Sequence, residues 1–187
     1  MHRTAEELEA FLPELRAAPA DHGILEVLVR RPAVGEREVL DVGELSTEEG
    51  LVGDTWRARG SKRTPDGSAH PDMQLTLMSS RMAGFLGATK GLAGDQLYVD
   101  LDLSVANLPP GTRLSIGSAV VEVTDQPHTG CAKFVARFGE PAMRFVNGGV
   151  GRELRLRGLN ARVVVPGTIR PGDAVSKEDG IPGRLEG

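Results

Sequence analysis

Three observations predict that this 187-residue chain adopts a mainly β fold with peripheral helices. First, at least seven short segments have the composition and spacing of strands and are separated by turn residues. Second, the chain holds 24 glycines and 12 prolines, which favour tight turns and short strands over long helices. Third, no glycine-rich phosphate-binding motif follows a strand, which disfavours a dinucleotide-binding fold. Together these observations indicate a β-barrel or a curled sheet decorated by helices.

The N-terminal segment predicts a helical arm. Residues 4–7 (Thr-Ala-Glu-Glu) form a capping-box pattern, and apolar residues then follow at helical spacing. Pro13 interrupts this pattern, so we expect a kink or two short helices. We therefore divide the chain into a helical arm (1–22), a barrel domain (23–176) and a frayed tail (177–187).

The strands are expected where apolar and β-branched residues run between turn signals. The clearest alternation has leucine or valine at every second position from Leu97 to Leu103. Gly117-Ser118 lies between two strand-like segments and indicates a hairpin. The other strands are expected at 24–30, 38–45, 73–78, 113–116, 119–124, 162–165 and 168–170, and helices at 79–86, 131–138 and 141–147.

Bulk composition excludes several classes of function. Hydrophobic residues make up 40% and charged residues 26%, as in ordinary soluble proteins, and no apolar run is long enough to span a membrane. An aromatic content of 4% and a net charge of −4 argue against a nucleic acid partner. A single cysteine and a charged N-terminus without a signal-like apolar run indicate the cytoplasm.

The negative net charge hides a basic segment. Residues 130–162 contain seven basic residues and two acidic ones, and this segment begins at the only cysteine, Cys131. Such a segment indicates either an anion-binding site beside the thiol or a solvated helical face.

A Gly-Asp pattern recurs along the chain. Gly50-Leu51-Val52-Gly53-Asp54 is repeated as Gly91-Leu92-Ala93-Gly94-Asp95, and a further pair is Gly172-Asp173. The glycines are expected to supply positive φ angles in turns that the aspartates cap. The alternative is that Asp54 and Asp95 face a ligand.

Cys131 is predicted to lie where a turn meets the first turn of a helix, because Pro127 and Gly130 precede it and an amphipathic stretch follows. Free backbone N–H groups and the positive helix end favour a thiolate there. In the alternative, the sulfur shares an apolar stripe with Val135 and Phe138 and is a buried filler.

His128, in the preceding turn, is the expected local partner of the thiol. Helical phase instead predicts that Lys133 and Arg137 project away from Cys131. Two other chemistries use the same residues: a zinc site completed by His70 and Asp72, or a hydrolase with Cys131 as nucleophile and His128 or His70 as base.

Several stretches together resemble one family, the MOSC domain, named for the C-terminal part of molybdenum cofactor sulfurases. They include the Pro-x-x-x-Cys-x-Lys stretch at 127–133, Arg-Gly-Leu-Asn-Ala-Arg-Val at 157–163 and a terminal Gly-Asp at 172–173. The remaining matches are residues 50–54, 74–76, 108–118 and 167–171, so that the resemblance covers about 23–176.

The resemblance implies a MOSC-type β-barrel, similar to the β-barrel domain of pyruvate kinase. It implies that Cys131 carries sulfur as a persulfide or binds molybdenum. It also implies a molybdenum cofactor (molybdopterin), or another anionic small molecule, as ligand. Arg157 and Arg162 match the family stretch and, with Arg137, are the expected ligands of its phosphate.

The resemblance leaves alternatives open. Trp56 stands where many members have histidine, and Asp95-Gln96 where many have Glu-Asn, so a non-catalytic binding barrel is one of them. A molybdenum-dependent reductase of N-hydroxylated compounds, served by an electron-transfer protein, is another. A pyridoxal phosphate site is not expected within this chain, so a sulfur carrier would be loaded by a separate cysteine desulfurase.

Overall fold

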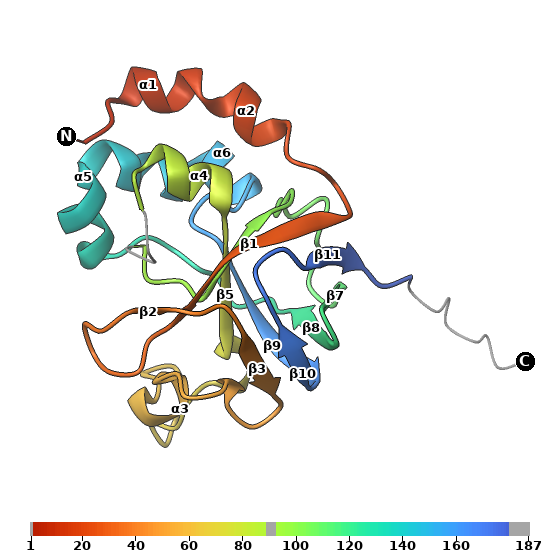
Figure 1. Ribbon diagram of the computed structural model, residues 1–187. Helices are drawn as coiled ribbons and strands as arrows, with labels where there is room; N and C mark the ends of the chain where they lie inside the picture. Colours follow the sequence, from red (N-terminus) through yellow and green to blue (C-terminus); the bar gives the residue numbers. More distant parts are fainter. Residues whose placement is uncertain (1, 89–92, 180–187) are drawn as a thin grey trace, which may run out of the picture.

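Seven strands close into a β-barrel in the computed structural model, which describes residues 2–88 and 93–179 (Figure 1). The strand order is β11-β7-β8-β9-β5-β6-β1, and β1 pairs back with β11. β5 and β6 run parallel, whereas the other neighbouring barrel strands run antiparallel. The predicted barrel fold is thus confirmed. Its strands are β1 (Gly23–Arg30), β5 (Leu75–Ser79), β6 (Leu97–Asp100), β7 (Arg113–Ile116), β8 (Ala119–Val123), β9 (Leu159–Val165) and β11 (Ala174–Lys177).

A smaller sheet lies beside the barrel. It has the order β10-β3-β4, formed by β10 (Gly167–Ile169), β3 (Gly43–Ser46) and β4 (Gly50–Leu51). The predicted strand 38–45 is in fact two strands, because β2 (Glu38–Val39) pairs with β1 whereas β3 pairs with β10. Sequence patterns also missed β4 and β11, and they extended the strand at 97–103 beyond Asp100, where β6 ends.

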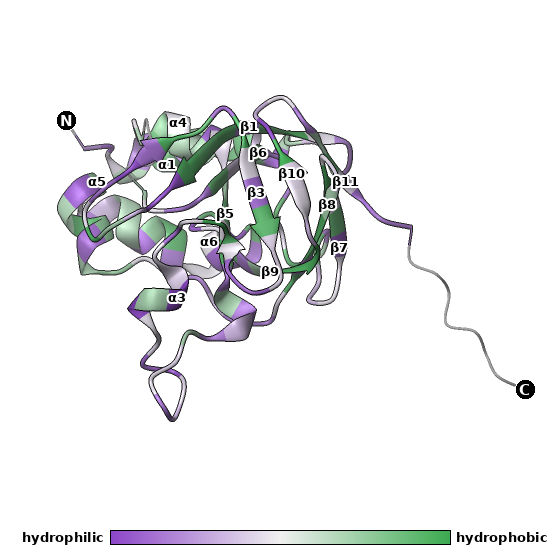
Figure 2. Cartoon of the chain, turned by 60° about the horizontal axis from the view of Figure 1, so that its bottom comes forward, coloured by the Kyte–Doolittle hydropathy of each residue, from purple (hydrophilic) through white to green (hydrophobic). Residues whose placement is uncertain are grey.

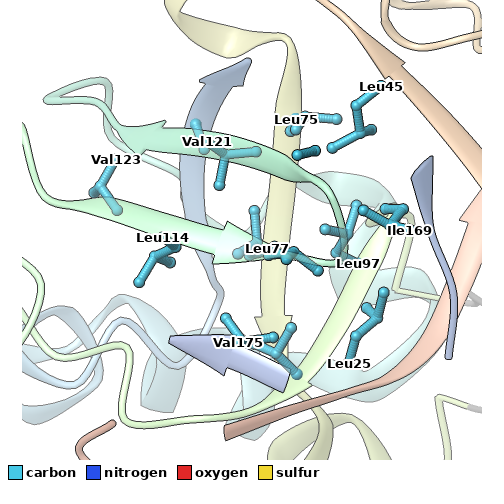
Figure 3. Packing of buried hydrophobic residues seen from close by; sticks show 14 of the residues in the cluster. Leu25, Leu45, Leu75, Leu77, Leu97, Leu114, Val121, Val123, Ile169 and Val175 are labelled. Carbon is cyan, nitrogen blue, oxygen red and sulfur yellow. The ribbon is translucent and has the colours of Figure 1, made fainter. Parts of the chain in front are cut away.

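Aliphatic side chains from all seven strands fill the barrel interior. Leu77, Leu97 and Leu114 are fully buried, and Figure 3 shows them converging with Val121 and Val175 from different strands. The hydropathy colouring shows the same concentration of apolar residues on the barrel strands (Figure 2). Each such side chain contributes about 1.5–3 kcal/mol when fully buried. The barrel is therefore a packed core, and a ligand site must lie outside it.

Helices cover one side of the barrel and pack over a second apolar cluster. They are α1 (Ala5–Ala10), α2 (Leu12–Arg16), α4 (Ser80–Phe85), α5 (Ala132–Asn147) and α6 (Gly149–Glu153). The predicted capping box at Thr4 and Glu7 is present, and the arm breaks into two helices at Phe11, before Pro13. Leu8 of the arm and Phe134 of α5 both belong to this second cluster. None of the described helices is long and apolar enough to cross a membrane.

α5 is interrupted at Gly139, whose φ of 86° and ψ of 166° are not helical. The predicted helices at 131–138 and 141–147 are therefore the two halves of α5. Three short helical elements among the described residues were not predicted: α3 (Trp56–Arg59), the 3₁₀ helix η1 (Pro71–Met73) and α6. Figure 1 shows β2, α3 and α5 on the same side of the barrel.

The proposed division into arm, barrel and tail stays a prediction. β11 includes Lys177, so at least the first residue of the predicted tail belongs to a strand. Most of that tail, residues 180–187, lies outside the described residues, as do Gly91 and Leu92 of the second Gly-Asp repeat.

Candidate functional site

Cys131 is exposed and lies immediately before α5, as its N-cap residue. Its backbone is extended, with φ −126° and ψ 180°, and its carbonyl accepts hydrogen bonds from the N–H groups of Phe134 and Val135. The loop before it is fixed by Asn147, whose Oδ1 accepts from the Gly130 N–H at 2.9 Å. The predicted position of the thiol is confirmed, and the alternative of a buried apolar filler is wrong.

The thiol lines a cavity of about 580 Å³. The walls come from the β1–β2 loop, the segment around α3, the segment before β6, the start of α5 and the segment from Arg157 to Asn160. Among the described residues, no aspartate or glutamate lines this cavity. Six basic side chains do: Arg31, Arg37, Arg59, Lys133, Arg137 and Arg157. The cavity is therefore suited to an anion.

The floor of the cavity, defined here as His128, Arg157 and Asn160, is organised by a buried carboxylate. Asp95 is fully buried, and its Oδ1 lies 2.7 Å from His128 Nε2. Its Oδ2 accepts a hydrogen bond from Arg157 Nη1 at 2.6 Å. Arg157 Nη2 donates to the Ala93 carbonyl, and its guanidinium lies over the Phe134 ring at 5.3 Å. These contacts leave one donor, Nε of Arg157, buried and unpaired among the described residues.

The charge state of the floor follows from its burial. Burial raises the pKa of Asp95, but the nearby Arg157 charge and His128 lower it more, so that the pKa lies well below its ordinary value. For His128, burial and then the Arg157 charge lower the pKa despite the carboxylate. Asp95 is thus ionised and His128 neutral at pH 7. Nε2–H of His128 donates to Asp95, which leaves Nδ1 as an acceptor.

Asn160 ties the floor to the loop before the cysteine. Its Nδ2 donates to the carbonyl groups of Gln126 and Pro127, at 3.1 and 3.4 Å. Its Oδ1 is buried without a partner among the described residues. The residue at 158 must be small, because a Cβ there would clash with the Leu77 carbonyl and would lie 3.1 Å from His128 Cδ2. Its φ of 113° also favours glycine. The floor therefore contains one buried unpaired donor and one buried unpaired acceptor among the described residues, on two residues that line the cavity.

Asp54, the counterpart of Asp95 in the first Gly-Asp repeat, positions another arginine. Its carboxylate accepts hydrogen bonds from Arg31 Nε at 2.9 Å and Nη2 at 2.6 Å, and it also caps the start of α3 through the Trp56 N–H. Arg31 Nη1 then reaches the Gly94 carbonyl at 3.0 Å. Neither Asp54 nor Asp95 lines the cavity, and each instead holds an arginine that does. The expected positive φ angles are present at Gly53 and Gly94.

The rim of the cavity, defined here as Arg37, Arg59, Lys133 and Arg137, is more exposed than the floor. Lys133 and Arg137 line the same cavity as Cys131, contrary to the prediction from helical phase. That prediction failed because Cys131 itself has extended backbone geometry, so helical periodicity does not relate it to residues of α5.

Arg162 does not line the cavity. It is exposed on β9, where Nη2 contacts Glu122 of the neighbouring strand at 2.7 Å and Nη1 contacts Asp72 at 3.3 Å. Arg157 lines the cavity, whereas Arg162 is paired with Asp72 and Glu122 outside it. The two arginines expected to act together are thus not brought together, and a cofactor contact of Arg162 stays a prediction without support from the cavity.

Residues 31–61 contribute three cavity arginines, Arg31, Arg37 and Arg59, that sequence reasoning missed. The repeated Gly-Asp pattern was the one available signal, because Asp54 positions Arg31. A zinc site finds no support, since no group of three or more potential metal-ligating side chains occurs among the described residues.

The matching family model is the MOSC domain, over residues 68–176, which is more than half of the chain. No curated protein matches the sequence. Among solved structures, the YUAD protein from Bacillus subtilis has a TM-score of 0.63 at 16% identity, over 82% of this chain and 93% of that one. YiiM from Escherichia coli has a TM-score of 0.53 at 21% identity, over 83% and 70% of the two chains. YiiM from Geobacillus stearothermophilus has a TM-score of 0.51 at 15% identity, over 88% and 76%.

The fold and the site define a closed barrel that carries a single exposed thiol at a basic cavity. The chain belongs to the MOSC domain family, which is associated with molybdenum cofactor binding. The structural neighbours, all below 25% identity, support the fold alone.

Proposed function

We propose that this protein binds a molybdopterin-type cofactor in the cavity, with Cys131 as the protein's sulfur ligand to molybdenum. The observation that carries the proposal is the exposed Cys131 thiol on a cavity lined by six basic residues and, among the described residues, by no acidic one. When bound, such a cofactor supplies a redox-active metal together with further sulfur ligands. A chain that offers one thiol and no cluster of metal ligands among its described residues suits a metal that arrives with ligands of its own.

The residues present fit such a group. The unpaired Nε of Arg157 is a donor and the unpaired Oδ1 of Asn160 is an acceptor, which suits a heterocycle that carries both kinds of group. Lys133 and Arg137 lie four residues apart on α5, beside Cys131 in the cavity wall, and suit a phosphate. A volume of about 580 Å³ is within the range of cofactor pockets.

Asp95, His128 and Cys131 have different tasks in this proposal. Asp95 holds Arg157 and His128 in place before any ligand arrives, so their ordering is not required on binding. His128 is neutral, and its Nδ1 can accept a proton from a thiol or from water. The nearby cations, Lys133 and Arg137, favour an anionic ligand beside Cys131.

Cofactor loading tests the proposal. The protein is incubated with molybdenum cofactor released from a donor enzyme, and molybdenum and oxidised pterin are then measured per chain. We expect both in the parent protein, less molybdenum per pterin in Cys131→Ser, and loss of both in Arg157→Gln. Arg162→Gln, which removes an arginine outside the cavity, is the matched control and should load normally. A parent protein that retains neither component contradicts the proposal.

A sulfur-carrier role is the second candidate, and the exposure of Cys131 favours it, because a donor protein can reach the sulfur. In this role the Cys131 thiolate attacks the outer sulfur of a desulfurase persulfide. A Cys131 persulfide forms, and the desulfurase thiolate leaves. Mass spectrometry after incubation with a cysteine desulfurase and cysteine should show a gain of about 32 Da, one sulfur atom, that is absent from Cys131→Ala. A molybdenum-dependent reductase with a separate electron-transfer protein would instead keep the metal and gain no such mass.

A further inference from the structure

Two arginines of the rim, Arg37 and Arg59, carry positive charge that no described carboxylate balances. Arg31 is paired with Asp54, and Arg157 with Asp95. Arg37 and Arg59, by contrast, form no ion pair with any described carboxylate, although both line the same cavity. Nε of Arg37 is in addition buried without a hydrogen-bond partner among the described residues. A buried donor left unpaired is uncommon in a folded protein and indicates a missing partner.

Three guanidinium groups converge at Gly94. Arg31 Nη1 donates to the Gly94 carbonyl, and a Cβ built on Gly94 would lie 3.7 Å from Arg37 Nη2 and 3.8 Å from Arg137 Nη1. Because Gly94 has no side chain, it does not fill the space between Arg37, from the β1–β2 loop, and Arg137, from α5. Like charges at such short range repel one another unless an anion lies between them.

The same crowding affects ionisation. Incomplete solvation, followed by the charges of Arg137 and Arg31, lowers the pKa of Arg37 from its ordinary value. The pKa of Arg59 is lowered in the same direction by incomplete solvation and then by Arg31. Both arginines remain charged at pH 7, since their ordinary pKa is above 12. The charge of Asp54 acts in the opposite direction on both pKa values but does not offset this lowering.

We propose that Arg37 and Arg59, with Arg31 and Arg137, form a binding site for a phosphate-type oxyanion at the mouth of the Cys131 cavity. A phosphate group has enough acceptor oxygens for several guanidinium forks at once, whereas a carboxylate has two. Three of its four arginines, Arg31, Arg37 and Arg59, lie outside residues 68–176, the segment matched by the family model, so most of this site comes from the N-terminal part of the chain. The inference adds a site to the proposed function, and only the identity of the molecule that bears the phosphate rests on that function.

Two sources of the phosphate share this chemistry. It can belong to a phosphorylated small substrate that enters beside a bound cofactor, or it can be the phosphate end of the cofactor itself. The volume of about 580 Å³ is far larger than an inorganic phosphate ion, so in either case the anion is part of a larger small molecule.

Calorimetric titration with inorganic pyrophosphate, in low-salt buffer free of phosphate, tests the site. The parent protein is expected to show saturable binding at one site. Arg37→Gln and Arg59→Gln should each weaken binding by about tenfold, and the double variant by about a hundredfold, as expected for charge-assisted hydrogen bonds. The control is the double variant Arg16→Gln/Arg170→Gln, which removes two exposed charges that do not line the cavity and should bind as the parent does.

Two further measurements separate the possible explanations. Thermal unfolding without ligand should show that the Arg37→Gln/Arg59→Gln variant is at least as stable as the parent, because repulsion between the arginines is relieved. Weaker binding by this variant would then not reflect misfolding.

Cys131→Ser should bind pyrophosphate normally, so failure of the thiol chemistry and failure of the anion site are distinguishable. If protein loaded with cofactor still binds pyrophosphate, the site takes a phosphorylated substrate, and if loading prevents binding, the site takes the cofactor's phosphate. No saturable binding by the parent, or equal weakening in the control, overturns the proposal.

Discussion

The floor and the rim of the cavity are both cationic, but their charges are balanced differently. In the floor, Arg157 is buried against Asp95, which also binds His128, so the positive charge is compensated within the protein. In the rim, Arg37 and Arg59 have no described carboxylate partner. The floor is therefore held in place by contacts within the protein. The rim, in our proposal, is stabilised by a bound anion.

Replacement of Asp95 by asparagine should have the largest effect on stability. The change leaves the buried Arg157 charge without its counter-ion, which typically costs about 3–5 kcal/mol of unfolding free energy. Urea denaturation measures this cost. Asp173→Asn, in the equivalent Gly-Asp pair at 172–173, is the matched control: its Oδ2 caps only the Arg170 N–H, so a loss of about 1 kcal/mol is expected. If the two variants unfold at the same denaturant concentration, Asp95 does not organise the floor.

The floor should also make stability depend on pH. Because the pKa of Asp95 is lowered in the folded state, its contribution is fully present above the unfolded pKa of about 4 and is lost as pH falls toward the folded value. The folded pKa of His128 is lowered too, so the unfolded state takes up that proton first and stability declines as pH falls below about 6.5. Unfolding free energies measured between pH 8 and 3 should decline more steeply in the parent than in His128→Gln/Asp95→Asn. Parallel curves would contradict these assignments.

Gly94→Ala should affect the rim and the fold together. Its φ of 96° disfavours alanine by about 1–2 kcal/mol, and the added methyl group would lie where Arg37 and Arg137 converge. Gly172→Ala has the same backbone strain, with φ of 97°, but no atom within 4 Å of the new methyl group. Both variants should lose similar stability, whereas only Gly94→Ala should weaken pyrophosphate binding. Equal binding by the two variants would mean that the convergence at Gly94 has no role in anion binding.

Arg162→Gln should have the smallest effect. Its ion pairs with Asp72 and Glu122 are exposed, and such pairs contribute about 0–1 kcal/mol. Thermal unfolding and pyrophosphate titration should both resemble those of the parent. A strong loss of anion binding in this variant would restore Arg162 as a site residue and would remove the reason for assigning anion binding to the rim.

The features that sequence alone predicted correctly depend on local interactions. The hairpin at Gly117-Ser118 and the position of Cys131 before a helix are set by neighbouring residues, and both are present. The division of α5 follows from Gly139, whose conformation also depends on local geometry. The barrel as a whole followed from the number of short strands and from the family resemblance.

The features that sequence missed depend on contacts between distant segments. Arg31 reaches Asp54 and Gly94 across 23 and 63 positions, and no local pattern encodes such contacts. The basic segment 130–162 left two interpretations open, an anion site or a solvated face, and its arginines in fact divide: Arg157 lines the cavity, whereas Arg162 pairs with Glu122 of β8. Net charge along the sequence therefore did not indicate which arginines line the cavity.

The most direct test of the central claim is an anomalous diffraction map, recorded at the molybdenum absorption edge from crystals of cofactor-loaded protein. The account predicts one strong peak in the cavity, adjacent to the Cys131 sulfur, and a weaker peak at that position in crystals of Cys131→Ser. A peak at another part of the barrel, or a molybdenum-containing crystal with no peak beside Cys131, would contradict it.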